Sequence, residues 1–541
     1  MTRQIQLSIL LMLLLGFPAA AQQNTTAKIT IKPYLQDATP HSIKVMWETS
    51  SGEESIVEWG TSPKLGNKTK GTAFPINYSD ARVHEVSLAD LERLTMYYYR
   101  VRTGKAVSEI YQFKTPPFAR DEQAFQLVAM SDMQIDDGKP DKFAEIVQDG
   151  VLTYLQNEFE GEVPENLALV MIPGDLVTDG GVYEQWNEHF FTPAQDLFSQ
   201  VPVYPVPGNH ERNSQYFFKY FSLPRNGSPE FDEHWWYKDY GNVRIIGLDS
   251  NEGYRNRTQL GWLDEVLAKT RENDSIDFVF AQLHHPHKSE LWLAGEEDFT
   301  GEVVKKLETF STETGKPSIH FFGHTHGYSR GQSRDHKHLW INVATAGGNI
   351  DYWGEFAQQN YDEFTVTQDE YGFVMVEVDP NQGDPKFTVK RFSQGNENLE
   401  RENELRDSVT VWRFDKKPST PQAISPKNTK VNPFNIMLKA NAFSSDLASA
   451  EHGASHWQLA TTGDFKEPVF DSWKQFEDWY AYQDLQKDDD LTDEKLRKLN
   501  ENTTYFWRVR YRDKNLNWSE WSAPARFTTE GQISSQTEEE E

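Results

Sequence analysis

The sequence contains no cysteine among its 541 residues, and this absence excludes several kinds of chemistry. Without thiols the chain can form no disulfide, no thiolate metal site and no cysteine nucleophile. Positive charge is also scarce, because 54 Lys and Arg face 83 Asp and Glu, for a formal net charge of −29. Such a charge repels polyanions, so we expect no general nucleic-acid binding.

Long apolar runs are missing except near the N-terminus. Arg3 precedes an apolar stretch over residues 5–17, which ends at Pro18 and is followed by three alanines, residues 19–21. A charged start, a short apolar segment and small residues at a cut site are typical of a secretory signal, whereas a membrane span needs about 20 apolar residues. We therefore expect cleavage after Ala21, no membrane span, and an exported product that is periplasmic or secreted.

What is present predicts several folded domains. Hydrophobic residues make up 37% of the chain, which is enough for packed cores in a protein of this length. Short alternating runs over residues 28–117 predict an antiparallel β-sandwich. Between 123 and 414 apolar strands alternate with helical stretches such as 142–159 and 258–270, which predicts an α/β domain.

A linker at about 416–422 leads to a second predicted sandwich over 419–530 and an acidic tail at 531–541. The second sandwich contains a W-S-x-W-S segment, Trp518 to Ser522, beside alternating arginines at positions 508, 510 and 512. We expect these side chains to form a structural Trp/Arg stack.

Metal-competent side chains follow five apolar runs of the middle domain. These clusters contain Asp132 and Gln134, Gly174-Asp175, Gly208-Asn209-His210-Glu211, His284-His285, and Gly323-His324-Thr325-His326. The carboxyl ends of strands in an open α/β sheet border the ligand crevice. Oxygen and imidazole donors without sulfur suit divalent or trivalent iron, zinc or manganese, so the five strand ends together predict a metal site.

This set resembles the calcineurin-like metallophosphoesterases, whose pattern is D-x-H, G-D, G-N-H-[DE], a histidine at a strand end and G-H-x-H. The first sandwich resembles the amino-terminal domain of purple acid phosphatases, in stretches such as Pro33-Tyr-Leu-Gln and Val45-Met-Trp-Glu-Thr. The resemblance implies a multidomain fold: an α/β metallophosphoesterase core, built as a β-sandwich flanked by helices, between two antiparallel fibronectin type III-like β-sandwiches.

The resemblance also implies two metal ions. Asp175 would bridge them, and His210 would stabilise the transition state or protonate the leaving oxygen. Arg212 and His287 are second-tier candidates for binding the phosphate of the substrate, with a surface role open for both. The remaining ligands would be Asp132 and His326 on the first metal, and Asn209, His284 and His324 on the second.

Two positions depart from the family pattern. Gln134 stands where D-x-H has histidine, and Thr178 stands where purple acid phosphatases have a metal-binding tyrosine. We therefore expect no tyrosinate-to-iron colour and a more loosely held first metal, which would be Mn, Mg or Fe rather than Zn. Gln134 is either a weak amide ligand or only a hydrogen-bonding neighbour of the site.

The predicted function is that of an exported dinuclear-metal phosphoesterase that hydrolyses phosphate monoesters of small-molecule or glycan-linked substrates by metal-hydroxide attack. One alternative is a phosphodiesterase acting on nucleotides or lipid headgroups. Another is an inactive carbohydrate- or surface-binding protein whose metal site has decayed.

Overall fold

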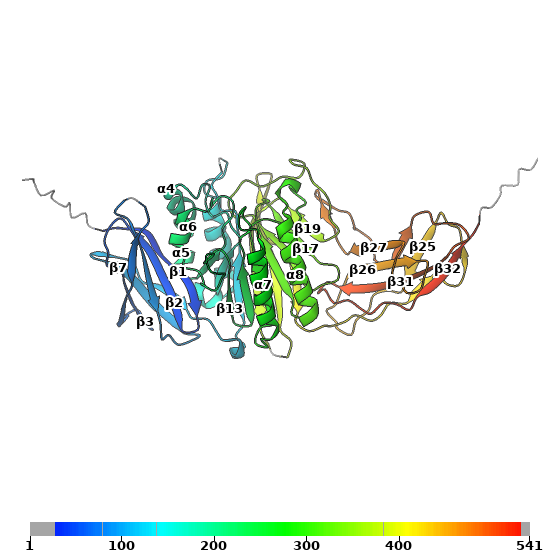
Figure 1. The fold of residues 1–541 in the computed structure, drawn as a ribbon, viewed down its shortest axis with the longest axis horizontal. Helices are drawn as coiled ribbons and strands as arrows, with labels where there is room; N and C mark the ends of the chain where they lie inside the picture. The colour runs from blue at the N-terminus through cyan, green and yellow to red at the C-terminus, as the bar shows by residue number, and fades with distance from the viewer. Residues whose placement is uncertain (1–26, 78, 137, 382, 532–541) are drawn as a thin grey trace, which may run out of the picture.

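The computed structural model of the protein describes residues 27–77, 79–136, 138–381 and 383–531, and it arranges them as three units in a row (Figure 1). The predicted signal peptide, residues 1–21, and residues 532–541 of the predicted acidic tail lie outside the described residues.

The first unit is a sandwich of two antiparallel sheets. Residues along β7 (Met96–Thr103) alternate between buried and half-buried, and Tyr97, Tyr99 and Val101 enter the core. This period of two places one apolar face against the opposite sheet. One sheet has the order β1 (Ile29–Thr39), β2 (Ser42–Thr49), β6 (Arg82–Leu88), β5 (Thr72–Pro75); the other has β4 (Asn67–Lys70), β3 (Ile56–Gly60), β7, β8 (Ala106–Val107), with β9 (Tyr111–Lys114) also paired to β7.

The central unit is built from two mixed sheets packed face to face. Leu127 and Val170 of one sheet share a core with Phe280 of the other. Three strands of the first sheet run parallel, and so do four of the second. The first sheet has the order β12 (Val203–Pro205), β11 (Leu169–Ile172), β10 (Phe125–Ala129), β20 (Tyr371–Asp379), β21 (Lys386–Asn396), β22 (Leu399–Trp412). The second has β13 (Trp236–Tyr240), β14 (Val243–Gly247), β15 (Phe278–Gln282), β16 (Ser318–Phe322), β18 (His338–Val343), β17 (Tyr328–Gln332), β19 (Phe364–Gln368), β28 (Trp479–Tyr480), β29 (Gln483–Asp484).

Helices cover the outer faces of this central sandwich. Leu263 of α7 (Arg257–Arg271) and Val303 of α8 (Asp298–Thr314) pack on Val279 of β15. The predicted helix over 142–159 is divided into α1 (Lys142–Glu145), the π-helix η2 (Ile146–Leu152) and α2 (Thr153–Glu158). The shorter helices are η1 (Ala119–Asp121), α3 (Val163–Asn166), α4 (Tyr183–Gln185), η3 (Trp186–Phe191), α5 (Gln195–Phe198), α6 (Gln215–Tyr220) and η4 (Leu293–Gly295).

The third unit is again a sandwich. Trp457, Trp507 and Leu438 lie in its core. Its first sheet has the order β23 (Ala423–Ser425), β25 (Ile436–Ala440), β30 (Asp493–Leu496); the second has β24 (Lys430–Val431), β32 (Ala525–Thr529), β31 (Thr504–Asp513), β26 (His452–Ala460), β27 (Phe470–Gln475). The predicted arrangement, a core of β-sandwich type flanked by helices and placed between two further sandwiches, is therefore confirmed.

The predicted Trp/Arg stack is present and joins the third unit to the core. The guanidinium of Arg510 lies 4.3 Å from the ring centroid of Trp518 and 4.6 Å from that of Trp521. Arg510 also pairs with Asp335 of the central unit, and the Trp518 indole donates to the Arg334 carbonyl at 2.6 Å. The W-S-x-W-S segment thus fixes the last sandwich against the core.

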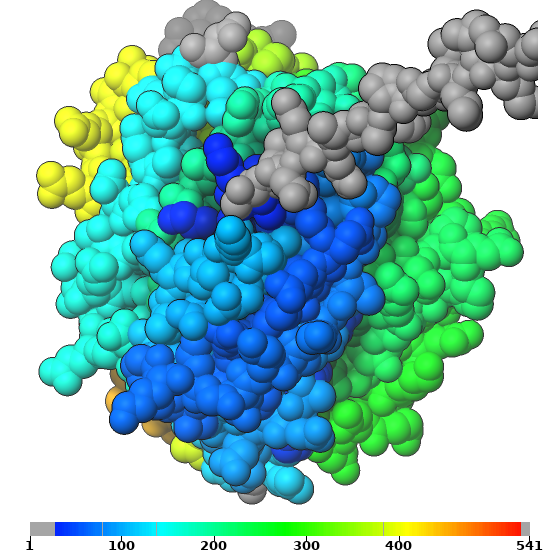
Figure 2. Space-filling view, turned by 90° about the vertical axis from the view of Figure 1, so that its left-hand side faces the viewer, coloured from blue at the N-terminus to red at the C-terminus, as the bar shows by residue number. Residues whose placement is uncertain are grey.

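The first sandwich is tied to the core by a buried carboxylate. Glu48 of β2 accepts hydrogen bonds from the hydroxyls of Tyr183 and Tyr220 of the central unit, both at 2.7 Å, and from Thr30 at 2.6 Å. Figure 2 shows this sandwich, in blue, lying over the cyan and green residues of the core.

No helix in the described part of the chain has the length and apolarity that crossing a membrane requires.

Candidate metal centre

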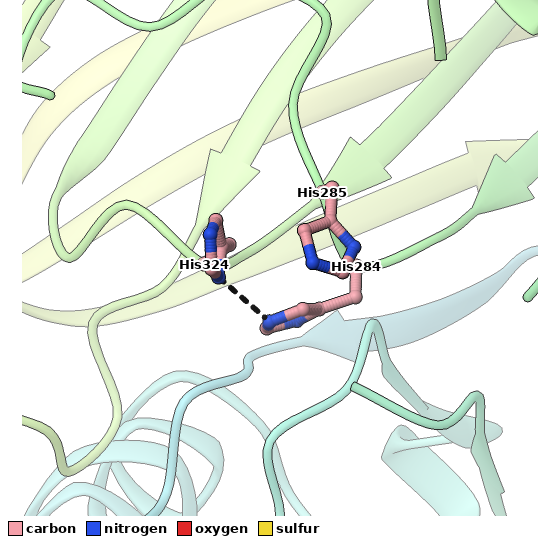
Figure 3. A group of neighbouring side chains, drawn as sticks. All are labelled: His284, His285 and His324. Carbon is pink, nitrogen blue, oxygen red and sulfur yellow. Dashed lines mark hydrogen bonds between the residues drawn. The ribbon is translucent and has the colours of Figure 1, made fainter. Parts of the chain in front are cut away.

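Side chains from five strand ends converge in the central unit. The Nε2 of His284, after β15, lies 3.0 Å from Oδ2 of Asp175, after β11, and 2.9 Å from Oδ1 of Asn209, after β12. It also lies 3.2 Å from Nδ1 of His324, after β16 (Figure 3). Asp132, after β10, joins Asp175 and His284 in a group whose ligand atoms lie within 4.8 Å of one another.

The backbone turns sharply at the residues that carry these groups. Asp132, Asp175 and His324 have φ values of 60°, 53° and 72°, in the left-handed region that non-glycine residues rarely occupy. Such strain persists where the surrounding structure fixes it, and it is common at functional sites.

Two glycines leave room for the carboxylates. A Cβ on Gly208 would lie 2.1 Å from Oδ1 of Asp175, and one on Gly323 would lie 2.3 Å from Oδ2 of Asp132. Any side chain at either position would therefore displace a carboxylate.

Backbone carbonyls orient two of the imidazoles. The Nδ1 of His284 lies 3.0 Å from the Pro173 carbonyl oxygen, and the Nδ1 of His326 lies 2.6 Å from that of Asn349. Since a carbonyl accepts, each Nδ1 carries a proton, and Nε2 is the ring atom turned toward the cluster and available to a metal ion. Metal-binding histidines are oriented in this way.

The charges of the cluster are unbalanced in a way that a cation would correct. Burial lowers the pKa of His284, but Asp175 outweighs it and raises that pKa to about 9; Asp132 likewise raises the pKa of His326 to about 10. Burial and the neighbouring His284 lower the pKa of His324 to about 3. Buried carboxylates therefore draw positive charge to this crevice, and protons on imidazoles supply it only in part.

The donor set fits metal ions. Carboxylate, amide and imidazole atoms face one another at distances of 2.9–3.3 Å, and an ion between them would replace these contacts with ligand bonds. Oxygen and nitrogen donors without sulfur suit iron, zinc or manganese, as the sequence predicts.

Gln134 lies beside the predicted first-metal ligands. Its Nε2 is 3.0 Å from Nε2 of His326, which in turn is 3.3 Å from Oδ1 of Asp132. Its Oε1 is buried without a hydrogen-bond partner among the described residues. The amide is thus placed to serve as a ligand or to support one, and both interpretations from the sequence stay open.

Thr178 does not replace the missing tyrosine as a ligand. Its hydroxyl donates to the carbonyl of Ile135 at 2.9 Å and lies 3.2 Å from Nδ1 of His189. The hydroxyl therefore serves local structure.

His210 is held at the edge of the cluster. Its Nδ1 donates to the carbonyl of Thr178 at 2.7 Å, and its Nε2 lies 3.9 Å from Oδ2 of Asp175. Its side chain is 33% exposed. The predicted catalytic histidine therefore lies next to the predicted bridging carboxylate.

Arg212 and His287, the two residues predicted to contact the phosphate, have their recorded contacts outside the cluster. Arg212 is 64% exposed and forms an ion pair with Asp179 at 2.8 Å. His287 packs against Gly301 of α8, and its ring lies 5.7 Å from that of Trp340. The structure records no contact of either side chain with the cluster, so their roles stay predictions.

Two carboxylates around the site were given no role by the sequence analysis. The buried carboxylate of Glu211 accepts from the backbone of Asp175, Leu176 and Gly208 at 2.6–2.9 Å, and Asp351 accepts from the backbone of His326 at 2.7 Å. Glu211 stands in the G-N-H-E motif, and this was the one available signal. Nothing local in the sequence marks Asp351.

His285, which follows His284 in the same sequence cluster, also lies beside the predicted metal ligands. One of its ring nitrogens groups with those of His284 and His324 within 4.8 Å, as Figure 3 shows for the three side chains. Its Nδ1 lies 2.9 Å from the hydroxyl of Ser250, and burial strongly lowers its pKa. It is a neutral neighbour of the predicted second-metal ligands.

Three known protein families match this chain, in the same order as the three units of the structure. Residues 125–328 match the calcineurin-like phosphoesterase family, and residues 30–115 match the N-terminal domain of purple acid phosphatases. Residues 430–531 match the N-terminal immunoglobulin domain of Rha78A-like proteins.

Individual relatives are distant. Purple acid phosphatase 1 of Ipomoea batatas is 24% identical over 321 residues, which cover 55% of this chain and 63% of that protein. "Probable inactive purple acid phosphatase 1" of Arabidopsis thaliana is 26% identical over 323 residues, covering 53% and 50%. The match thus spans half to two thirds of these relatives. The purple acid phosphatase PPD1 from yellow lupin (Lupinus luteus) has the same fold, with a TM-score of 0.55 at 18% identity, covering 70% of this chain and 73% of that one.

The central unit is therefore a calcineurin-like metallophosphoesterase domain, as the resemblance implied. With the sandwich that precedes it, the arrangement is that of purple acid phosphatases, extended by an immunoglobulin-like domain.

Proposed function

We propose that the protein is an exported dinuclear-metal phosphoesterase that hydrolyses phosphate monoesters. The convergence of Asp132, Asp175 and His284 within 4.8 Å, with Asn209 and His324 in contact with His284, supports this proposal most directly. The family match of the surrounding domain adds to it.

The residues present would hold two ions in the way the family pattern implies, with Asp175 between them. Two bound cations supply positive charge for the phosphoryl oxygens and lower the pKa of water toward about 7. Substrate phosphate would enter a crevice whose own carboxylates the cations have neutralised, so the net charge of −29 does not exclude an anionic substrate.

His210 would donate a proton to the leaving group. Its Nδ1 proton is committed to the Thr178 carbonyl, so Nε2 is the atom that exchanges a proton or hydrogen bond with the substrate. The backbone N–H of His210 donates to Oδ1 of Asp175 at 2.9 Å, which fixes the histidine relative to the bridging carboxylate. A histidine so placed is suited to protonate the alkoxide that departs from phosphorus.

Export is part of the proposal and rests on the sequence of residues 1–21. The charged start, apolar segment and alanines predict a signal that is removed. N-terminal sequencing of the protein recovered from outside the cytoplasm should begin at Gln22, and an intact Met1 on exported protein would contradict cleavage.

The test of the activity is hydrolysis of nitrophenyl phosphate and bis-nitrophenyl phosphate by the metal-loaded protein. We expect the monoester to be preferred, and preference for the diester would favour the phosphodiesterase alternative. If the protein hydrolyses neither ester and is retained on immobilised glycan, the alternative of an inactive binding protein is favoured.

Asp175→Asn is the matching variant. It removes charge from the bridging position, and a loss of about 4 kcal/mol of transition-state stabilisation would lower turnover about a thousandfold. Asp264→Asn is its control, because Asp264 lies on α7 and is 59% exposed. Unchanged turnover in Asp175→Asn would refute the metal assignment.

A further inference from the structure

Aromatic side chains border the metal-ligand cluster on the side of His324 and His326. The indole of Trp292 lies 5.2 Å from the ring of His324, centroid to centroid, and 5.8 Å from the ring of Phe356. Phe356 is 40% exposed. An apolar surface therefore begins directly beside a predicted ligand of the second metal.

The loop over residues 347–361 carries this surface further. It holds His326 at two points, through the carbonyl of Asn349 and the carboxylate of Asp351. Trp353 follows Asp351 by two residues, a Cα separation of at most about 7.6 Å. The loop is tied to the segment of Trp292, because Leu293 donates to the carbonyl of Ala357 at 3.1 Å.

The C-terminal unit completes this border. Its residues 476–485 leave the sandwich as a hairpin. In this hairpin β28 pairs in parallel with β19 of the second sheet of the central unit, at Val366 and Trp479. This segment is drawn in orange against the core in Figure 1. The ring of Tyr480 meets that of Trp353 edge to face at 4.8 Å, and Tyr482 donates to Asp369, which also accepts from the backbone of Trp353 at 3.3 Å.

We call this set of side chains the aromatic rim: Trp292, Trp353, Phe356, Tyr480 and Tyr482. Its last member is 67% exposed. Phe356 is also exposed, and Trp292, Trp353 and Tyr480 are half-buried. Partly exposed aromatic side chains grouped next to a polar crevice are typical of a binding site.

The two segments that carry most of the rim contribute only negative charge, although Glu477 pairs with Arg330 at 3.0 Å and Lys288 lies over the ring of Tyr361. Residues 351–361 and 476–485 contain no Lys, Arg or His and five carboxylates, at positions 351, 355, 477, 478 and 484. A second phosphate or carboxylate on the substrate would be repelled there, whereas hydroxyl groups could donate hydrogen bonds to the carboxylates.

We propose that the aromatic rim binds the alcohol part of the substrate and selects an uncharged, hydroxyl-rich ring, that is, the sugar of a sugar phosphate. The apolar face of a sugar packs on aromatic rings while its hydroxyls reach the carboxylates. This inference rests on the proposed phosphoesterase function, and it gives the C-terminal unit a role in specificity. Tyr480 and Tyr482 are specificity residues supplied by another domain to the catalytic crevice.

The experiment compares kcat and KM of the metal-loaded full chain on four phosphate esters. Glucose 6-phosphate has a neutral ring, glycerol 2-phosphate has no ring, fructose 1,6-bisphosphate adds a second phosphate, and phosphocholine adds a cation. The variants are Tyr480→Ala and Tyr482→Ala. Phe434→Ala is the control, because Phe434 is 57% exposed on the same C-terminal unit.

We expect glucose 6-phosphate to have the highest kcat/KM. Tyr480→Ala and Tyr482→Ala should raise its KM about five- to tenfold and leave kcat and the values for glycerol 2-phosphate unchanged. Phe434→Ala should change nothing. Equal losses on all four esters, no loss on any, or a preference for the bisphosphate or for phosphocholine would overturn the inference.

A binding measurement separates this inference from the proposed function. Tryptophan fluorescence is titrated with glucose 6-phosphate in the wild type and in Trp353→Phe. Because the chain has 16 tryptophans, only the part of the signal that Trp353→Phe loses reports on the rim, and it does so without turnover. Turnover by the wild type on any ester, with no rim effect in either assay, would reject the inference alone. Absence of all turnover would reject the phosphoesterase function, and the titration would still decide whether the rim binds sugar phosphate.

Discussion

The carboxylate of Glu211 accepts a hydrogen bond from the backbone nitrogen of Asp175 at 2.9 Å. The same carboxylate accepts from Leu176 at 2.7 Å and from Gly208 at 2.6 Å, so it joins the turn after β11 to the turn after β12. Burial and the neighbouring Asp175 raise the pKa of Glu211 to about 7. Glu211 therefore positions the predicted bridging ligand from inside the core.

Replacing Glu211 should damage both the fold and the metal site. Glu211→Ala leaves three buried N–H groups without their acceptor, which should lower the free energy of unfolding by about 3 kcal/mol or more. Metal affinity should fall about 10- to 100-fold, as is common when a group that orients a ligand is lost. Urea unfolding and metal titration measure the two effects, with exposed Glu188→Ala as control. A Glu211→Ala protein with wild-type metal affinity would contradict the positioning role.

The sequence predicted the ligand clusters because each follows a compact apolar run. The runs ending near Asp132, Asp175 and His284 are β10, β11 and β15, and their parallel neighbours bring their carboxyl ends to common edges. Gly208 and Gly323 belong to the sequence motifs. Only the structure shows why glycine is required there, because a side chain at either position would occupy the space of a carboxylate.

Long-range pairing could not be read from the sequence. The short strand β28 has only two residues, and its partner β19 lies more than a hundred positions earlier in the chain. The local pattern of β28 is not amphipathic enough to predict a strand. The sequence therefore did not predict that the C-terminal unit extends the second sheet of the central unit. The division of the helix over 142–159 by a π-helical turn was missed for a similar reason, because periodicity does not distinguish an α-helix from a short π-segment.

Gln134 offers a test of the first metal site. If its amide is a weak ligand, Gln134→His should strengthen retention of the first metal about tenfold or more, and Gln134→Ala should weaken it. Metal content after graded chelation measures both. Two equally tight zinc ions in the wild type would contradict the expected weakness, and equal retention in all three proteins would show that Gln134 is only a neighbour of the site.

Protonation of His84 should make the N-terminal sandwich less stable in acid. Burial lowers the pKa of His84 to about 4, and its ring lies between the hydroxyls of Thr49 and Ser55 and stacks on Trp47. Because the unfolded chain binds this proton near pH 6.5, stability is fully present above that pH and is lost as the pH falls toward about 4, with a slope of at most about 1.4 kcal/mol per pH unit. Unfolding followed by tryptophan fluorescence at pH 7, 6 and 5 checks the slope. His84→Gln should flatten it, and an unchanged slope in that variant would assign the effect to other groups.

His210 allows the sharpest test of the chemistry, because its two ring nitrogens have different partners. Nδ1 is bound to the Thr178 carbonyl and Nε2 lies 3.9 Å from Oδ2 of Asp175, so any proton that His210 gives to the leaving group comes from Nε2. His210→Gln should lower kcat about 10²- to 10⁴-fold on an alkyl phosphate, whose leaving oxygen needs a proton. The loss should be far smaller on nitrophenyl phosphate, whose phenolate leaves without one, while metal content stays at the wild-type level. His189→Gln is a matched control, since His189 lies near Thr178 but its recorded contacts are with that residue and not with the cluster. Equal losses on both esters would show that His210 acts by binding phosphate or holding charge and not by donating a proton.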